Sequence, residues 1–236
     1  MSSSRGVIWG RPERAAHGPA PSLSREQITT AAIKLADTQG IAALSMRTLA
    51  AELGVGAASL YRYVARKDEL IDLMVDAVMG NDLQFEIRGN WREDLRSYAQ
   101  GLRAMMLRHP WMTVPSAGLR SLGPNTARRY EQVLSAIDDL GLGIDEMLVM
   151  GETLDAYVRG RALEELSEQE AVRRSGLDQE QWMQTQLTYI TSLLESGRYP
   201  LLTRVFDAPL DPDRLKHGFD LGLERVLDGL AQMLPE

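Results

Sequence analysis

Cysteine is absent from this sequence of 236 residues. Its absence excludes disulfide bonds and thiolate metal sites, and it is typical of proteins from a reducing compartment. Long hydrophobic runs are absent as well. No stretch approaches the length of a membrane span, and residues 1–10 lack the apolar core of a signal peptide. We therefore expect a cytoplasmic protein that does not contact the membrane.

Catalytic motifs are also missing. The sequence contains no HExxH, no GxSxG, no phosphate-binding loop and no GxGxxG after a strand, and it has no cysteine nucleophile. Its three histidines are scattered and lack the spacing of a metal site. These absences predict a protein that is not an enzyme and uses no cofactor or metal. A hydrolase of unforeseen geometry is the remaining enzymatic alternative.

Strict alternation of polar and apolar residues, the signature of strands, is not found either. Apolar residues recur at helical spacing instead, which predicts an all-α chain of about ten helices. We expect three regions: a disordered arm over residues 1–22, a three-helix unit over 23–70 and a larger helical domain over 71–236. No internal repeat is present.

The expected arm over residues 1–22 is rich in Ser, Gly, Ala and Pro, and its prolines oppose helix formation. Arg5, Arg11 and Arg14 are of the type that enters a DNA minor groove. A solvated tail with incidental arginines is the simpler interpretation, and we favour it.

Residues 23–70 contain the clearest pattern. Ser24, with a glutamine three residues later, forms a capping box that starts a first helix. Ser45 caps a second helix, and Gly54 ends that helix and opens a tight turn. A short third helix is expected over about 56–63. Two short helices joined by a glycine turn are the pattern of a helix-turn-helix.

Small residues at the start of the third helix suit close approach to a major groove. Arg47, near the start of the second helix, can reach a guanine edge or a phosphate. Periodicity alone leaves a small helical bundle with a solvated charged face as an equal alternative. The candidate DNA-binding residues are Thr29, Ser45, Arg47, Ala57, Ala58, Ser59, Tyr61, Arg62, Tyr63 and Lys67.

This segment resembles the DNA-binding domain of the TetR family of bacterial transcriptional regulators. The third helix carries fewer polar side chains than is usual, so base contacts are expected from Arg47, Ser59, Arg62 and Tyr63, with the alanines against thymine methyls. The resemblance rests on Thr29–Ala32, Leu35, Gly40, Leu44–Met46, Leu49–Ala50, Leu53–Gly54–Val55, Leu60–Tyr61 and Lys67–Asp68–Glu69–Leu70.

Net charge is −7, which is unusual for a DNA-binding protein. Its distribution is uneven. Residues 1–70 hold nine Lys or Arg against six Asp or Glu, and the remainder holds 17 basic against 27 acidic residues. Because affinity for phosphate depends on the local patch, the N-terminal part remains suited to nucleic acid.

Seven further helices are expected after the three helices of the helix-turn-helix unit. Polar residues 167–177 are expected to form a mobile loop, and Gly197 and Pro200 to interrupt the chain. The expected helices span about 67–85, 91–109, 111–118, 124–140, 144–166, 178–195 and 212–234.

The helices over 144–166 and 212–234 carry apolar stripes that include glycines, which allow close packing of helices. Packing within the chain is one explanation. Members of the TetR family pair their last helices into a homodimer, so the resemblance implies a four-helix interface between two copies. Two DNA-binding domains about 34–36 Å apart then match a palindromic operator.

The middle helices concentrate aromatic and methionine residues of the type that line small-molecule pockets. Plain core packing explains such residues equally simply, but the family resemblance implies an effector site. The candidate ligand-binding residues are Tyr98, Leu102, Met105, Met106, Trp111, Ser116, Leu119, Tyr130, Leu134, Asp155 and Trp182.

Residues 85–153 are similar to the regulatory domain of the tetracycline repressors. Those proteins use a histidine, an asparagine, a phenylalanine and a glutamine for magnesium–tetracycline. The matching positions here are Ser116, Tyr98, Leu102 and Ala136, which predicts a larger and more apolar effector without a metal.

Together these features predict a repressor that a small apolar effector releases from double-stranded operator DNA. A helical protein-interaction or architectural regulator without an effector is the alternative.

Overall fold

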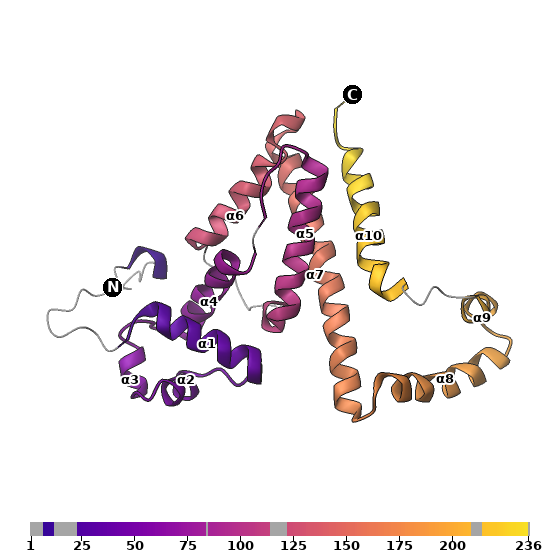
Figure 1. The fold of residues 1–236 in the computed structure, drawn as a ribbon, viewed down its shortest axis with the longest axis horizontal. Coiled ribbons are helices and arrows are strands. Elements are labelled where there is room, and N and C mark those ends of the chain that lie inside the picture. The colour runs from indigo at the N-terminus through magenta and orange to yellow at the C-terminus, as the bar shows by residue number, and fades with distance from the viewer. Residues whose placement is uncertain (1–6, 12–22, 84, 114–121, 209–213, 236) are drawn as a thin grey trace, which may run out of the picture.

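The computed structural model describes residues 7–11, 23–83, 85–113, 122–208 and 214–235 (Figure 1). Helices dominate these ranges, which contain no strand, as the periodicity predicts. In order the elements are η1 (Ile8–Gly10), α1 (Arg25–Gln39), α2 (Met46–Glu52), α3 (Ala57–Leu60), α4 (Lys67–Asn81), α5 (Trp91–Arg108), η2 (Pro110–Thr113), α6 (Pro124–Ser135), η3 (Asp138–Leu140), α7 (Ile144–Ser175), α8 (Gln179–Glu195), α9 (Pro200–Asp207) and α10 (Arg214–Ala231).

Helices α1, α2 and α3 form a compact head at one end of the molecule (Figure 1). The capping box predicted at Ser24 and the N-cap predicted at Ser45 are both present, so each helix begins where the sequence indicates. Ile28, Leu49 and Leu60 are fully buried and hold the three helices together. The third helix is shorter than expected, because residues 61–63 form a turn.

Helix α4 joins this head to the body. It packs against α1 on one side and against α6 on the other. The domain boundary expected after residue 70 falls inside this continuous helix, which ends at Asn81 rather than near Phe85. Head and body are therefore connected by a helix and not by a flexible linker.

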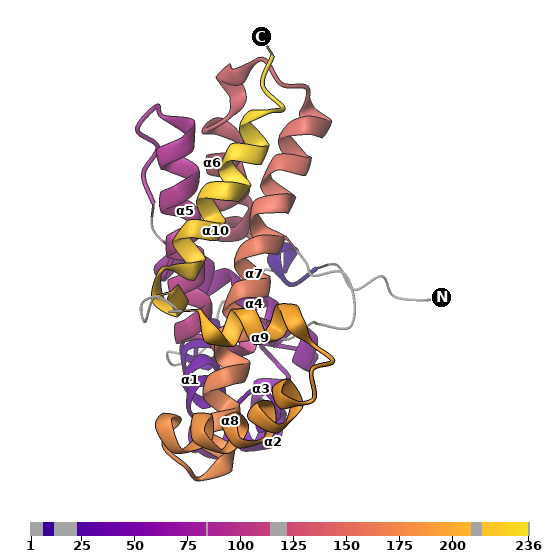
Figure 2. The same ribbon diagram turned by 90° about the vertical axis from the view of Figure 1, so that its right-hand side faces the viewer.

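The body is built around α5 and α7, which lie side by side, with α6 and α10 packed on them (Figures 1 and 2). Helix α10 buries Phe219, Leu223, Leu227 and Leu230 within the chain. Part of the apolar stripe expected to serve dimerisation is thus used for intramolecular packing. Within the described ranges no helix is both long and apolar enough to cross a membrane.

The mobile loop expected over 167–177 is wrong. Helix α7 continues through Ser175, and Gly176 ends it in the left-handed conformation at φ 68°. The segment is polar but helix-forming, because Glu170 pairs with Arg173 and with Arg174 one turn later. Polarity here marks a solvated helix surface rather than a loop.

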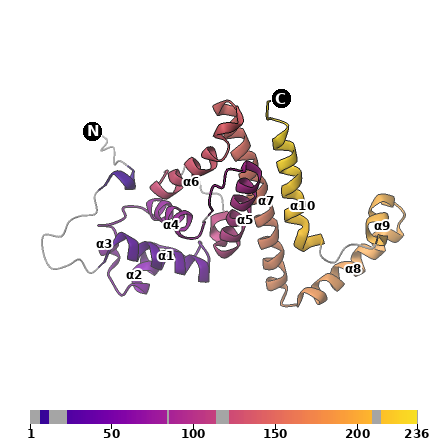
Figure 3. The same cartoon turned by 45° about the horizontal axis from the view of Figure 1, so that its top comes forward.

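Helices α8 and α9 form an arm that projects away from the body (Figures 1 and 3). Helix α8 begins at an Asp178–Gln181 capping box, which agrees with the helix expected over about 178–195. Helix α9 was not expected, because Pro200 was interpreted as an interruption. It instead occupies the first helical turn, where its missing N–H costs nothing.

The disordered arm expected over 1–22 is wrong for residues 7–11. Ile8 is 1% exposed, and Arg11 Nη2 lies 2.5 Å from Glu69 Oε2 of α4. Arg11 is therefore held against the protein and is not free for a minor groove. Arg5, Arg14 and the rest of the expected arm lie outside the described residues.

Two further helix boundaries differ from expectation. The helix expected over 111–118 is the 3-10 turn η2, which ends at Thr113, and the remainder lies outside the described residues. The helix expected over 124–140 ends at Ser135, and η3 follows it.

Candidate DNA interface and effector cavity

The head exposes a small polar surface around α2 and α3. Arg47, Ala58, Tyr61 and Arg62 are exposed to solvent. Gly54, at φ 67°, makes the tight turn that sets the two helices at an angle, a conformation that favours glycine. Both arginines are available to phosphates or base edges at the surface where small α3 residues permit close approach.

Other predicted DNA contacts are partly engaged within the head. Ser45 caps α2, accepting a hydrogen bond from Thr48 N at 3.1 Å. Lys67 Nζ donates to the Ile41 carbonyl at 3.4 Å. Ala57, Ser59 and Tyr63 are half-buried.

Thr29 is a correction to the predicted interface. It is only 6% exposed, because it lies on the side of α1 that faces the core next to Ile28. Its hydroxyl is not presented to a ligand. A residue missed by the sequence analysis is Arg25, whose Nε donates to the Tyr63 carbonyl at 3.3 Å and ties α1 to the turn after α3.

The body contains two adjoining cavities of about 180 and 330 Å³ between α4, α5, α6 and α7. Tyr98, Tyr130, Asp155 and Arg159 line both, so we treat them as one effector cavity. Seven of the predicted ligand-binding residues line it: Tyr98, Leu102, Met105, Met106, Tyr130, Leu134 and Asp155.

Two predicted ligand-binding residues lie elsewhere. Trp111 is buried, and its Nε1 donates to Asp37 Oδ1 at 2.7 Å, so it serves the contact between head and body. Trp182 lies on α8 in the arm and does not line the cavity. Ser116 and Leu119 lie outside the described residues.

A buried polar pair lies on the cavity wall. Tyr98 Oη donates to Asp155 Oδ1 at 2.9 Å. Burial, followed by the neighbouring Asp155 carboxylate, raises the pKa of the Tyr98 hydroxyl well above its ordinary value. Burial also raises the pKa of Asp155, although the hydrogen bond from Tyr98 and the charge of Arg159 oppose that rise. Tyr98 is therefore a hydrogen-bond donor at neutral pH.

The sequence analysis missed the basic residues of the cavity, Arg129 and Arg159. It also missed Asp72, Val75 and Met79, by which α4 contributes to the wall. A cation on the side of a helix that also carries apolar core residues, as Arg129 is one turn before Val133 on α6, is the signal that could have indicated them. No group of three or more histidine or acidic residues suited to a metal is found in the described ranges.

The contact between α4 and α6 is made by a buried carboxylate. Asp76 is 4% exposed and accepts hydrogen bonds from Thr126 N at 2.8 Å, Thr126 Oγ1 at 2.9 Å and Asn125 Nδ2 at 3.1 Å. Gly123 is the N-cap of α6 and has no side chain to cap it. Asp76 takes that role from the neighbouring helix, where the helix dipole also favours an anion.

Glycine at position 123 makes this cap possible. A Cβ atom there would lie 2.3 Å from Asp76 Oδ1, so a side chain cannot be accommodated without displacing the carboxylate. Glycine is needed here for close approach between helices.

A second contact joins the head to the end of α5. His109 is 5% exposed, and its Nδ1 lies 2.8 Å from Asp37 Oδ1 of α1. Its Nε2 lies 3.3 Å from Asp82 Oδ2 at the end of α4. With Trp111, which also donates to Asp37, this histidine links α1, α4 and α5.

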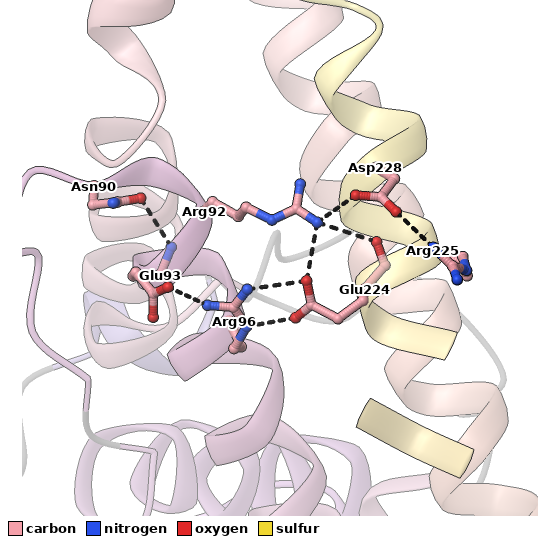
Figure 4. A network of polar contacts seen from close by, with 7 residues as sticks. All are labelled: Asn90, Arg92, Glu93, Arg96, Glu224, Arg225 and Asp228. Carbon is pink, nitrogen blue, oxygen red and sulfur yellow. Dashed lines mark hydrogen bonds and ion pairs between the residues drawn. The ribbon is translucent and has the colours of Figure 1, made fainter. Parts of the chain in front are cut away.

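Helices α5 and α10 are joined by ion pairs near the protein surface (Figure 4). Arg96 Nε lies 2.6 Å from Glu224 Oε1, and Arg92 Nη2 lies 2.9 Å from Glu224 Oε2 and 2.5 Å from Asp228 Oδ1. Hydrogen bonds from Arg96 and then Arg92 lower the pKa of Glu224 to about 2.

Comparison with known proteins identifies the class. Residues 28–74 match the family described as bacterial regulatory proteins, tetR family. Residues 86–234 match the tetracyclin repressor-like C-terminal domain. The chain therefore belongs to the TetR family and is a helix-turn-helix transcriptional regulator.

Individual relatives are transcriptional regulators of the same class. The HTH-type transcriptional repressor DrrR1 of Streptomyces coeruleorubidus is 37% identical over 98% of this chain and 85% of the relative. An HTH-type transcriptional regulator of Saccharopolyspora erythraea is 33% identical over 96% and 92%. The structure of ActR from Streptomyces coelicolor in complex with actinorhodin has a TM-score of 0.74 at 30% identity, covering 92% of this chain and 99% of that one.

Proposed function

We propose that the protein is a repressor whose affinity for operator DNA falls when a small molecule occupies the effector cavity. The observation that supports this is the position of α4. Asp72, Val75 and Met79 of α4 line the cavity, and the same helix packs against α1 of the head. A ligand that binds two positions of α4 with different affinity changes the population of each, which is the requirement for coupling two sites.

The effector is a small molecule with a substantial apolar part. Met105, Met106 and Leu102 give the cavity an adaptable apolar wall, and Tyr98 and Asp155 supply a few polar groups. ActR has been solved in complex with actinorhodin and with (S)-DNPA, so a protein related to this chain holds small molecules.

We infer that the working unit is a cytoplasmic homodimer paired through the helices around 144–166 and 212–234. Val149 and Leu163 of α7 and Leu221 of α10 are large apolar side chains that remain exposed in the single chain. Pairing two copies on these faces removes the apolar surface from water and presents two heads to a palindrome.

The proposal is tested by measuring binding of the purified full-length protein to DNA from upstream of its own coding region. We expect salt-sensitive binding that Arg47→Ala and Arg62→Ala each weaken by about 10- to 100-fold. Arg88→Ala removes an exposed arginine between α4 and α5, outside the head, and serves as the matched control. Unchanged binding in both head variants, with the dimer intact, contradicts the assignment of the reading surface.

A further inference from the structure

Two arginines face the effector cavity from different helices. Arg129 extends from α6 and is 8% exposed, whereas Arg159 extends from α7 and is exposed to solvent. Arg129 Nε donates to the Met79 carbonyl at 3.0 Å, and its Nη1 donates to Gln132 Oε1 at 2.7 Å. The guanidinium also lies over the Phe85 ring, 5.8 Å from its centroid.

Neither arginine forms a hydrogen bond or an ion pair with an acidic side chain among the described residues. Arg159 Nη1 donates to the Met112 carbonyl at 3.2 Å, and the partners of Arg129 are a carbonyl and an amide. Other arginines of the body, such as Arg92 and Arg96, do pair with carboxylates. A buried cation without a counter-ion is costly, because desolvation is not repaid by attraction.

Asp155, about one turn before Arg159 on α7, is the acidic residue nearest to it in sequence, and the charge of Arg159 acts on the pKa of Asp155 without a direct hydrogen bond between the two side chains among the described residues. Asp155 is engaged by the Tyr98 hydroxyl, which donates to it at 2.9 Å. Burial lowers the pKa of Arg129, as expected for a guanidinium whose charge is not met by an anion. The cavity thus combines a methionine-rich apolar wall with two arginines, and the buried one, Arg129, has no ion pair with an acidic side chain among the described residues.

Resting on the proposed function, we propose that the effector is an aromatic organic anion whose carboxylate or other ionised acidic group binds between Arg129 and Arg159. Guanidinium groups recognise planar anions through paired hydrogen bonds, which are stronger than those between neutral groups. The ring system packs against Met105 and Met106, where polarisable sulfur contacts aromatic faces favourably. Tyr130 adds a hydroxyl group on the same wall.

A purely structural role is the competing explanation for Arg129. In that case its bonds to the Met79 carbonyl and to Gln132 hold α4 against α6. Substitution of Arg129 then lowers the stability of the protein but does not change its preference between charged and neutral ligands. A measurement that compares a charged with a neutral probe of the same shape separates the two explanations.

The test uses 8-anilinonaphthalene-1-sulfonate and its neutral counterpart N-phenyl-1-naphthylamine, which lacks the sulfonate. Fluorescence titrations of the full-length protein are expected to show tighter binding of the anion. Arg129→Met and Arg159→Met should each weaken binding of the anion by about tenfold or more and leave the neutral probe within about twofold, as the loss of a charge-assisted hydrogen bond requires. Arg128→Met, at an exposed position one residue away, is the matched control.

Equal affinity for the two probes in the unmodified protein, or binding of neither, overturns the proposal. An equal loss of affinity for both probes in the variants also overturns it. If Arg129→Met fails to fold, Arg159→Met still decides the matter, because Arg159 is exposed and has one hydrogen bond to the described residues, from its Nη1 to the Met112 carbonyl. Operator binding without any probe tests the proposed function separately. A protein that prefers the anion but binds no operator contradicts only that function.

Discussion

Two contacts, one made by the head and one by its connecting helix α4, link this end of the molecule to the body, and they differ in chemistry. At the α4–α6 contact, the buried carboxylate of Asp76 accepts hydrogen bonds from the backbone and side chains at the start of α6. At the α1–α5 contact, His109 lies between the carboxylates of Asp37 and Asp82, each about a quarter exposed at its side chain. The first contact is fixed by helix geometry, and the second is made by side chains that reach across three helices.

The difference indicates which contact can rearrange. A backbone cap is lost only if α6 moves away from α4, whereas side chains at the α1–α5 contact can change rotamer without moving a helix. We therefore expect the α4–α6 contact to transmit movement from the cavity to the head, and the side chains of the α1–α5 contact to rearrange as the head moves.

The largest effect is expected from Asp76→Ala. It leaves the first N–H groups of α6 without an acceptor, and it should lower the free energy of unfolding by about 3 kcal/mol, the upper range for hydrogen bonds to a charged group. Chemical denaturation measures the loss. Asp76→Asn keeps one acceptor oxygen and serves as the matched control, with a loss of about 1 kcal/mol. Equal stability of the alanine variant and the unmodified protein would show that α6 does not depend on this cap.

A smaller effect is expected from His109→Phe at the α1–α5 contact. The substitution keeps an aromatic ring but leaves Asp37 and Asp82 without the imidazole between them, and it should cost about 1–2 kcal/mol. Arg108→Ala removes a partner of Asp82 from a more exposed position and should cost less than about 1 kcal/mol. Thermal unfolding and operator affinity are the measurements. A larger loss in Arg108→Ala than in His109→Phe would reverse the assigned importance of the two side chains.

The smallest effect is expected at the exposed contact between α5 and α10. Since the pKa of Glu224 is lowered to about 2 in the folded protein, its ion pairs contribute stability above its unfolded value, near 4.5, and lose it as pH falls toward 2. The side chain is 36% exposed, so Glu224→Gln should cost less than about 1 kcal/mol at neutral pH. The difference between the variant and the unmodified protein should disappear near pH 2. A difference that persists at that pH would point to packing rather than charge.

Most of the head was predictable from sequence, because its signals are local. Ser24 and Ser45 mark the starts of α1 and α2 within three residues, and Gly54 marks the turn between α2 and α3. The cavity was only partly predictable. Tyr98, Met105 and Asp155 stand out by residue type, but Arg129 and Arg159 face the cavity only because of how α6 and α7 pack.

Two other predictions were wrong because a polar stretch was interpreted only as a loop and a proline only as an interruption of a helix. The stretch after Leu166 is polar because both its sides face solvent, and Glu170 and Arg174 stabilise it as a helix. Thr29 was assigned by its chemistry, whereas its position on α1 decides that it is buried. The pair Glu170–Arg174 is a local signal, whereas the burial of Thr29 depends on tertiary packing, which no local pattern encodes.

Helix α7 is continuous along its whole length, so a small tilt at one point moves its far end. Its 32 residues span roughly 48 Å at the usual rise per residue. Asp155 and Arg159 lie near the middle of this rod, and the arm of α8 and α9 is attached at its far end. A tilt of only a few degrees at the cavity therefore displaces the base of the arm by an ångström or more, without any change in the helix itself.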